Sequence, residues 1–390
     1  MIVSKRILLN MNMASMLLCY SAMGITATTP DIKPQKISDK TSIHKEKTGR
    51  SKTDFYVGLL YIKPYSDNLK YATFVSGTQP YYQSWHYQAI DPDYSPAFEL
   101  GFNYAVPQTP YDAAVDWIHL DSSDTSFKQA SRNTDLMTVE FVAPPYEMSP
   151  PVFGIKRVNS KVKFEFDGIL VNAVKSVTYG QHVQAKFFGG LNILRLNQRV
   201  TTIFSDYAGS PGTPYSYPLP PDPSFSFKTE TVSEYLGAGP DVGVNVQYKM
   251  DSGFGILGQF LGSLTVGRIK TQDNFTSTSA RLTTLGIGTS RQYITAPNAT
   301  QVVPGADGKL GLFYNYQKNS SLDLTIEAGY RIAAYLNAIS TVNPGTLVQP
   351  GTVFVTPEFS TGTMAIVSTE ATSRPFNFNG PYINLKMAMA

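Results

Sequence analysis

Cysteine, long apolar runs and net charge of either sign are all scarce in this sequence. A single cysteine among 390 residues excludes a disulfide framework. No run of about eighteen apolar residues occurs, which excludes a helical membrane protein. The net charge is only +3, the sequence pI is near 8.6 and the basic residues are scattered, so nothing points to a nucleic-acid partner. Because 42% of the residues are hydrophobic, disorder throughout the chain is excluded as well.

The first 27 residues are typical of a secretory signal peptide. Lys5 and Arg6 supply a positively charged start, and residues 13–24 form an apolar stretch too short to span a bilayer. Small residues around its end offer cleavage sites. Residues 28–53 are rich in Lys, Ser and Thr and lack apolar periodicity, which predicts a disordered periplasmic linker.

From Asp54 onward the hydrophobic periodicity is two, which indicates β-strands. Between 97 and 106, Phe98 and Leu100 fall on one face, whereas Glu99 and Gly101 fall on the other. The same alternation holds in 111–120, 161–170, 237–249 and 322–336. The sequence therefore predicts an all-β protein made of two-faced strands.

Three features indicate that the apolar faces point outward, into lipid. Several strands reach ten or more residues, the length that a tilted strand needs to cross a bilayer. The polar faces combine Gly with charges of both signs, as expected around a narrow wet lumen. Short and long connections alternate, as in barrels with periplasmic turns and extracellular loops. A soluble barrel, with the apolar faces inward, is the alternative.

Residues 54–390 are therefore predicted to form an antiparallel transmembrane β-barrel with long extracellular loops. Ten strands are expected, and a hairpin near 69–75 or a strand pair around 136–142 would raise the number to twelve. The ten strands are placed at 54–63, 97–106, 111–120, 160–172, 183–203, 232–250, 254–269, 309–317, 322–336 and 376–389.

Aromatic residues near the predicted strand ends fit the two interfacial girdles of such a barrel. They are Tyr56, Tyr61, Tyr104, Tyr111, Trp117, Tyr248, Tyr314, Tyr330 and Tyr382.

The charged residues on the polar faces are the predicted pore lining. Acids and bases are equal in number among them, which predicts either weak selectivity or a lumen plugged by salt bridges. Ten strands enclose little room, so conduction is expected to be small. The residues are Glu99, Asp112, Asp116, Lys161, Lys163, Glu165, Asp167, Lys186, Arg195, Asp241, Lys249, Arg268, Asp323, Glu327, Arg331 and Lys386.

Several strings resemble the Legionella outer-membrane protein family of pore-forming porins. They are IEAGYRIAAYLNAI at 326–339, NGPYINLK at 379–386, YLGAGPD at 235–241, DFYVG at 54–58 and KFEFD at 163–167. The resemblance implies a pore-forming outer-membrane barrel without a cofactor. The chain ends in Met-Ala-Met-Ala, whereas outer-membrane strands commonly finish in the Phe that the barrel-assembly machinery reads.

The predicted function is passive, weakly selective diffusion of small solutes across the bacterial outer membrane. The alternative is a structural or adhesive surface barrel whose extracellular loops bind host or matrix components. An enzyme ranks third: Asp91 with Asp93, or Asp112 with Asp116, are the only candidate carboxylate pairs, and the four histidines have no partner at a telling spacing. We therefore predict no catalytic residues, no metal and no cofactor. The expected partners are outer-membrane lipid and the barrel-assembly machinery; a homo-oligomer is left open, and no nucleic acid is expected.

Overall fold

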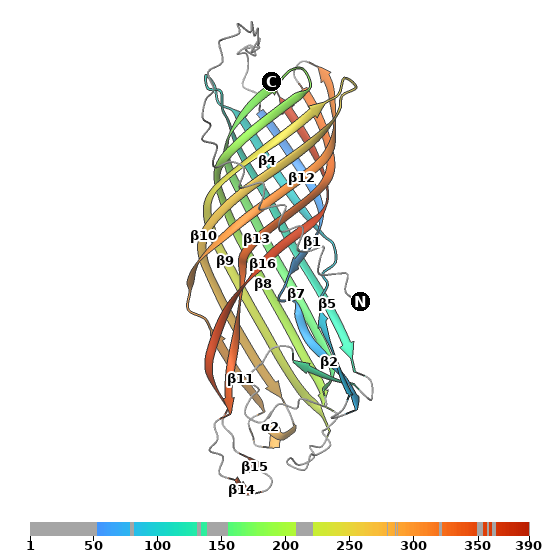
Figure 1. Ribbon diagram of the computed structural model, residues 1–390, viewed down its shortest axis with the longest axis vertical. Coiled ribbons are helices and arrows are strands. Elements are labelled where there is room, and N and C mark those ends of the chain that lie inside the picture. The colour runs from blue at the N-terminus through green and yellow to red at the C-terminus, as the bar shows by residue number, and fades with distance from the viewer. Residues whose placement is uncertain are drawn as a thin grey trace, which may run out of the picture. The chain divides into compact units, whose positions relative to one another are not determined.

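The computed structural model describes one compact unit within Gly49–Ala390 (Figure 1). The residues described are 53–78, 82–130, 134–138, 155–207, 221–278, 280–284, 286, 288–319, 322–348, 354–356, 359–360 and 364–389. The predicted signal peptide lies outside these residues, as does the predicted linker apart from Thr53. No helix among the described residues is long and apolar enough to cross a membrane.

Ten antiparallel strands close into a ring within the described residues. Each strand pairs with the next one along the chain, and β16 returns to pair with β1 through the partners Thr53 and Met389. The strands are β1 (Thr53–Ser66), β4 (Ser95–Ala105), β5 (Asp112–Gln129), β7 (Ile155–Tyr179), β8 (Val183–Tyr207), β9 (Asp222–Lys249), β10 (Phe254–Thr278), β12 (Ala299–Asn319), β13 (Leu322–Val348) and β16 (Met364–Met389). The predicted ten-stranded antiparallel barrel is thus confirmed.

The remaining elements are not strands of the ring. β2 (Lys70–Thr78), β3 (Tyr82–Ala89) and β6 (Thr134–Thr138) form a small extension attached to β7. β11 (Thr289–Thr295) pairs with β10, β14 (Phe354–Thr356) pairs with β15 (Phe359–Ser360), and α2 (Ala280–Thr284) is a single short helix. The extra segments near 69–75 and 136–142 therefore do not raise the ring to twelve strands.

The two ends of the barrel differ in their connections. At one end, uppermost in Figure 1, the strands are joined by the short segments 106–111, 180–182, 250–253 and 320–321, and Thr53 pairs there with Met389. The longer connections, with β11, α2, β14 and β15, belong to the other end. We call the two parts of the barrel the turn half and the loop half.

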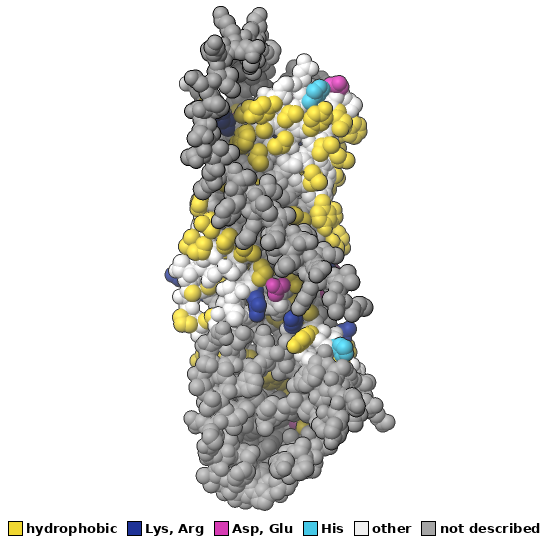
Figure 2. Space-filling view, viewed as in Figure 1, with side chains coloured by type: hydrophobic (Ala, Val, Ile, Leu, Met, Phe, Trp, Pro, Cys, Tyr) yellow, Lys and Arg dark blue, Asp and Glu magenta, His cyan; other side chains and the backbone are white. Residues whose placement is uncertain are grey.

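The outer face of the turn half is apolar. Along β1, Val57, Leu59 and Tyr61 are 41%, 64% and 54% exposed, whereas Leu60 and Ile62, which alternate with them, are buried in the interior. Figure 2 shows hydrophobic side chains over much of this half. We call this outer surface the apolar belt; it includes Phe102, Val115, Val171, Leu191, Val242, Phe260, Leu310, Leu312, Ile326, Ile383 and Leu385.

In the loop half the rule is reversed, because the outer face is charged and the interior is apolar. On β7, Val162, Phe164 and Phe166 are fully buried and the alternating Lys161, Lys163 and Glu165 point outward. Beyond Gly168 the outward positions become apolar, with Ile169 and Val171 on the belt side. A wall that meets water packs its apolar side chains inward, as soluble barrels do. The predicted outward apolar face of 161–170, formed by Val162, Phe164 and Phe166, is therefore wrong.

An aromatic layer fills the interior of the loop half. The ring centroid of Phe166 lies 5.4 Å from Tyr335, 5.5 Å from Phe376 and 5.4 Å from Phe378, and Phe164 lies 5.5 Å from Phe376. In the ring, β7 is separated from β16 by β5, β4 and β1. These contacts consequently run across the barrel rather than along its wall.

Candidate functional site

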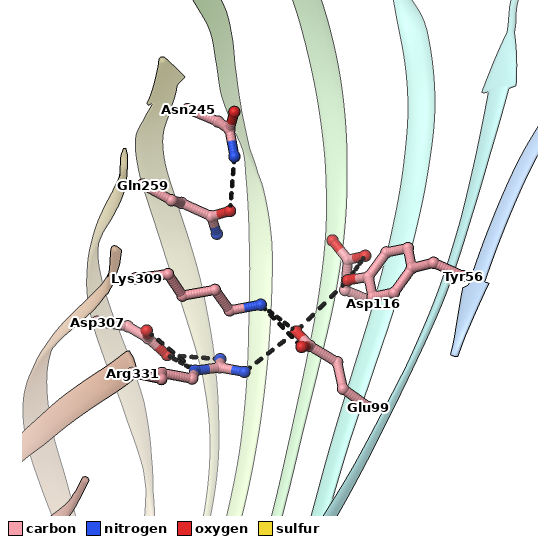
Figure 3. Close-up of polar contacts among 8 residues, drawn as sticks. All are labelled: Tyr56, Glu99, Asp116, Asn245, Gln259, Asp307, Lys309 and Arg331. Carbon is pink, nitrogen blue, oxygen red and sulfur yellow. Dashed lines mark hydrogen bonds and ion pairs between the residues drawn. The ribbon is translucent and has the colours of Figure 1, made fainter. Parts of the chain in front are cut away.

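A cluster of four ionised side chains crosses the interior of the turn half (Figure 3). Lys309 Nζ lies 2.7 and 2.8 Å from the two carboxylate oxygens of Glu99. Arg331 donates to Glu99 through Nη1 at 3.1 Å and to Asp307 through Nε and Nη2 at 2.6 to 3.1 Å. We call these four residues the ion cluster.

The ion cluster joins distant parts of the wall. Glu99 comes from β4, whereas Lys309 and Arg331 come from β12 and β13, with β1 and β16 between the two groups. Figure 3 shows the Asp307, Lys309 and Arg331 side chains pointing toward Glu99. Their outward neighbours are belt residues such as Leu310 and Ile332, so the cluster lies at the level of the apolar belt.

Burial makes the pairing within the ion cluster energetically important. Each of the four side chains is 5% exposed, and each ionised group would lose its hydration at large cost without a partner. Lys309 Nζ also lies 5.6 Å from the ring centroid of Tyr382, and the Arg331 guanidinium lies 5.8 Å from that of Phe378. The cluster therefore borders the aromatic layer directly.

Tyr56 extends the polar network toward β5. Its hydroxyl donates to Asp116 Oδ1 at 2.6 Å and lies 3.4 Å from Glu99 Oε1. The ring occupies the space over Gly101, where an added Cβ would collide with it. A glycine at this position thus allows the aromatic ring to lie against the inner wall.

The hairpin made by the loop-half ends of β13 and β16 bends at this end and packs against the inner face of β9. The β13–β16 register shifts between Tyr335 and Ile339, and Asn337 has a φ of 60° within the irregularity. Past this point Ile339 is fully buried, and the Ser340 N–H donates to Ser233 Oγ on β9 at 3.0 Å. A second crossing contact joins the Asn68 and Gln198 side-chain amides at 2.6 and 2.8 Å.

Polar groups line the rest of the turn half. Lys386 Nζ lies 3.5 Å from Asp54 Oδ2, and Asn245 Nδ2 donates to Gln259 Oε1 at 3.1 Å. The polar inner face thus runs from the turn end to the ion cluster.

Ten of the sixteen predicted lining residues lie on the inner face of the wall. They are Glu99, Asp112, Asp116, Lys186, Asp241, Lys249, Asp323, Glu327, Arg331 and Lys386. Of these, the ion cluster brings together Glu99 and Arg331, and Asp116 joins it through Tyr56. That these residues border a conducting passage stays a prediction.

Six predicted lining residues lie on the outer face instead, namely Lys161, Lys163, Glu165, Asp167, Arg195 and Arg268. Their inward neighbours on the same strands, such as Phe166, Leu196 and Ile269, are buried. The physical reason is the reversal described above, because these residues lie at or beyond the edge of the belt, where the outer face is polar. Their assignment to the lumen is wrong.

Three charged residues on the inner face of the turn half were not predicted as lining residues: Asp54, Asp307 and Lys309. The predicted strand began at residue 309, whereas β12 begins at Ala299. Continuing the alternation backward from Leu312 and Leu310 would have placed Asp307 and Lys309 on the polar face.

The aromatic girdle prediction needs two corrections. Tyr61, Tyr104, Tyr111, Tyr248, Tyr314 and Tyr330 are exposed. Tyr382 is buried inside the barrel, and Tyr56 points inward to Asp116. Both lie on the inner face because they fill space above inward-facing glycines, as the collision of a Cβ at Gly101 with Tyr56 and at Gly311 with Tyr382 indicates.

A charged groove of about 480 Å³ lies on the outer face of β7, β8 and β9. Its lining includes Lys161, Lys163, Glu165, Arg199, Glu230 and Glu234. Lys163 Nζ donates to Glu165 Oε1 at 2.6 Å, and Arg199 Nη1 donates to Glu230 Oε1 at 3.2 Å. The hydrogen bond from Lys163 lowers the pKa of Glu165, and the same hydrogen bond raises the pKa of Lys163.

The residues considered for enzyme chemistry have other partners. Asp91 pairs with Lys63 at 2.7 Å, and Asp116 accepts from Tyr56. Asp167 lies 2.7 Å from His119 Nδ1 and 3.3 Å from Trp117 Nε1 on the outer face. Among the described residues, no group of three or more His, Cys, Asp or Glu side chains is arranged to hold a metal ion.

Several solved structures are similar to this chain at low sequence identity. The outer membrane protease OmpT from Escherichia coli is 6% identical, with 87% of this chain and 96% of that chain covered and a TM-score of 0.35. A Pseudomonas aeruginosa FadL homologue is 11% identical (87% and 90% covered, TM-score 0.23), and the P. putida toluene transporter TodX is 7% identical (86% and 89% covered, TM-score 0.19). Similarities of this size carry no inference about what this chain binds or catalyses.

The sequence comparison is more informative. No curated protein matches the sequence significantly. Residues 48–389 match the family described as the Legionella pneumophila major outer membrane protein precursor. Since this match spans far more than half of the sequence, the chain belongs to the Legionella pneumophila major outer membrane protein family and is an outer-membrane β-barrel protein.

Proposed function

We propose that this barrel is a pore-forming protein whose passage for small solutes is closed at rest by side chains of its own inner wall. The observation that carries the proposal is the ion cluster, which joins Glu99 of β4 to Lys309 of β12 and Arg331 of β13 at the level of the apolar belt. Ionisable residues at membrane depth are costly and point to a functional role. At this level the closure consists of side chains, which can rearrange without unfolding the wall.

The inner charges also support a preference for one sign of ion. With the six outward residues removed and the three missed ones added, acids outnumber bases on the inner face of the turn half. The acids are Asp54, Glu99, Asp112, Asp116, Asp241, Asp307, Asp323 and Glu327, and the bases are Lys186, Lys249, Lys309, Arg331 and Lys386. An excess of carboxylates favours cations, so the balanced set expected from the sequence gives way to a weakly cation-preferring one.

Planar-bilayer recording on the purified, refolded full chain tests the proposal. We expect rare and small conductance steps, because the ion cluster and the aromatic layer must both rearrange before solute passes. Heat-modifiable gel mobility serves as the folding control for each preparation. A folded barrel that shows no steps across a wide voltage range would overturn the proposal.

A second candidate function is surface display, and the charged groove of β7, β8 and β9 favours it. The long connections of outer-membrane barrels face outward from the cell, which places this groove on the extracellular side. Substituting Lys161 and Arg199 by Gln would weaken attachment to host or matrix components and leave permeability unchanged if display is the main role. Loss of permeability without loss of attachment would favour the pore.

A further inference from the structure

Two arginines lie at the same level of the outer wall, one on each side of strand β9, at the loop-half edge of the apolar belt. Arg195 of β8 and Arg268 of β10 are both register partners of the same residue, Leu236 of β9. Neighbouring strands lie about 4.8 Å apart, so the two backbones flank Leu236 at a separation of about 10 Å. Leu236 itself is 59% exposed.

The surface below this arginine pair is apolar. On the same three strands the outward positions toward the turn half are Ile193, Ala238 and Val266, with Leu264 following on β10. On the opposite side of the pair, Lys270 is the next outward residue of β10. At the level of Leu236 the outer wall thus changes from apolar to charged.

The cationic groups at this edge are only weakly engaged by protein carboxylates. Arg195 Nη1 lies 3.8 Å from Asp167, whose other oxygen already lies 2.7 Å from His119 Nδ1. Neither Arg268 nor Lys270 forms an ion pair within the described part of the chain; Glu234 is the register partner of Lys270. The guanidinium groups are therefore available to an anion outside the protein.

We infer that Arg195 and Arg268, assisted by Lys270, bind the phosphate of an outer-leaflet lipid whose acyl chains lie on Leu236 and the belt below it. Guanidinium groups bind phosphate through paired hydrogen bonds, and long basic side chains at the edge of a membrane extend toward the headgroups. The occupant is a phosphorylated lipid rather than free phosphate, because the apolar surface continues directly from the arginine pair. This inference rests on the outer-membrane barrel and is independent of whether the interior conducts.

The test measures lipid binding to the full-length, heat-modifiable protein in detergent by native mass spectrometry. The probes are a bisphosphorylated lipid A, phosphatidylglycerol and phosphatidylethanolamine, each with and without millimolar inorganic phosphate. The test variant is R195Q/R268Q. The matched control is K63Q/R199Q, which removes the same charge from two outward residues that already pair with Asp91 and Glu230.

We expect R195Q/R268Q to bind bisphosphorylated lipid A at least tenfold more weakly than the unmodified protein, since each basic group near a membrane surface contributes measurably to anionic lipid binding. The control should stay within about twofold, and phosphatidylethanolamine should bind all three proteins equally weakly. Unchanged lipid A binding by R195Q/R268Q, or an equal loss in the control, would overturn the inference. Displacement of the lipid by inorganic phosphate would also overturn it, because the site would then be an anion site without a lipid component.

Discussion

At the residue scale, Glu99 connects side chains from several strands inside the barrel. It accepts hydrogen bonds from Lys309 and Arg331, and it lies 3.4 Å from the Tyr56 hydroxyl. Asp307 accepts its hydrogen bonds from Arg331, whereas Lys309 donates to the carboxylate of Glu99. Lys309 therefore depends on Glu99 for its carboxylate partner. Removing the charge of Glu99 therefore leaves Lys309 buried and uncompensated.

The variant E99Q is expected to unfold at lower denaturant concentration and to conduct more often. Removing one partner of a buried ion pair lowers the free energy of unfolding by about 3 kcal/mol. Lys309, released from Glu99, would no longer hold the proposed passage closed. Urea unfolding in lipid bilayers and planar-bilayer recording measure the two effects. The control E234Q makes the same chemical change on the exposed outer face, where neither quantity should change. Wild-type conductance from a folded E99Q barrel would contradict the role given to the ion cluster.

At the element scale, the β13–β16 hairpin packs its buried loop-half end against another part of the barrel wall. Its bend at Asn337 places Ser340 against Ser233 of β9, a strand that β12 and β10 separate from β13 in the ring. A covalent link between these two positions would hold the hairpin in this place.

The variant S233C/S340C, with Cys19 replaced by Ser, is expected to lose conductance when oxidised and to recover it after reduction. The contact of 3.0 Å between the two serines brings the cysteines within reach of each other. The control S160C/T202C joins adjacent strands, where the hydroxyls lie 2.7 Å apart, without crossing the lumen. Equal conductance in oxidised and reduced S233C/S340C would show that the hairpin does not block the passage.

Strand β9 carries both kinds of outer surface. Val242 lies midway along its belt-facing stretch and is 68% exposed, whereas Val232 lies in the charged groove. Both side chains point outward on the same strand. The same substitution at the two positions therefore compares the cost of a charge on the lipid-facing surface with its cost on the water-facing surface.

The variant V242K is expected to destabilise the folded barrel by about 2–4 kcal/mol, whereas V232K should be nearly neutral. A lysine at the middle of the belt places a charge in hydrocarbon, and a lysine in the groove stays hydrated. Urea unfolding in lipid vesicles measures both changes. Similar values for the two variants would show that the outer face of the turn half does not contact lipid.

At the scale of the whole molecule, one half of the barrel wall is suited to lipid and the other half to water. The turn half is apolar outside and charged inside, and the loop half is charged outside and apolar inside. The excess of carboxylates on the inner face of the turn half belongs to the barrel as a whole, since it comes from strands all around the ring.

A salt gradient across a bilayer that contains the folded protein should give a reversal potential of the sign expected for cation preference. The carboxylates of the inner face raise the local concentration of cations. The preference should weaken when the salt concentration rises, because mobile ions screen the charges. The variant D112N/D323N should reduce the reversal potential, and K161Q/K163Q, on the outer face, should not. A reversal potential of the opposite sign would reject the charge assignment.

The sequence by itself determined the ten strands, their antiparallel order and the outward apolar faces of the turn half. It could do so because a membrane wall needs long strands with strict alternation, and this pattern is local. Tertiary structure alone decided which alternating stretches lie beyond the bilayer, and it thereby moved Lys163, Glu165 and Arg195 from the lumen to the outer wall. The same alternation of apolar and polar residues suits a strand in lipid, where the apolar face points outward, and a strand in water, where the apolar face points inward. Contacts across the ring, such as Glu99 with Lys309, depend on closure and shear, which bring residues 210 positions apart together and leave no signal in local periodicity.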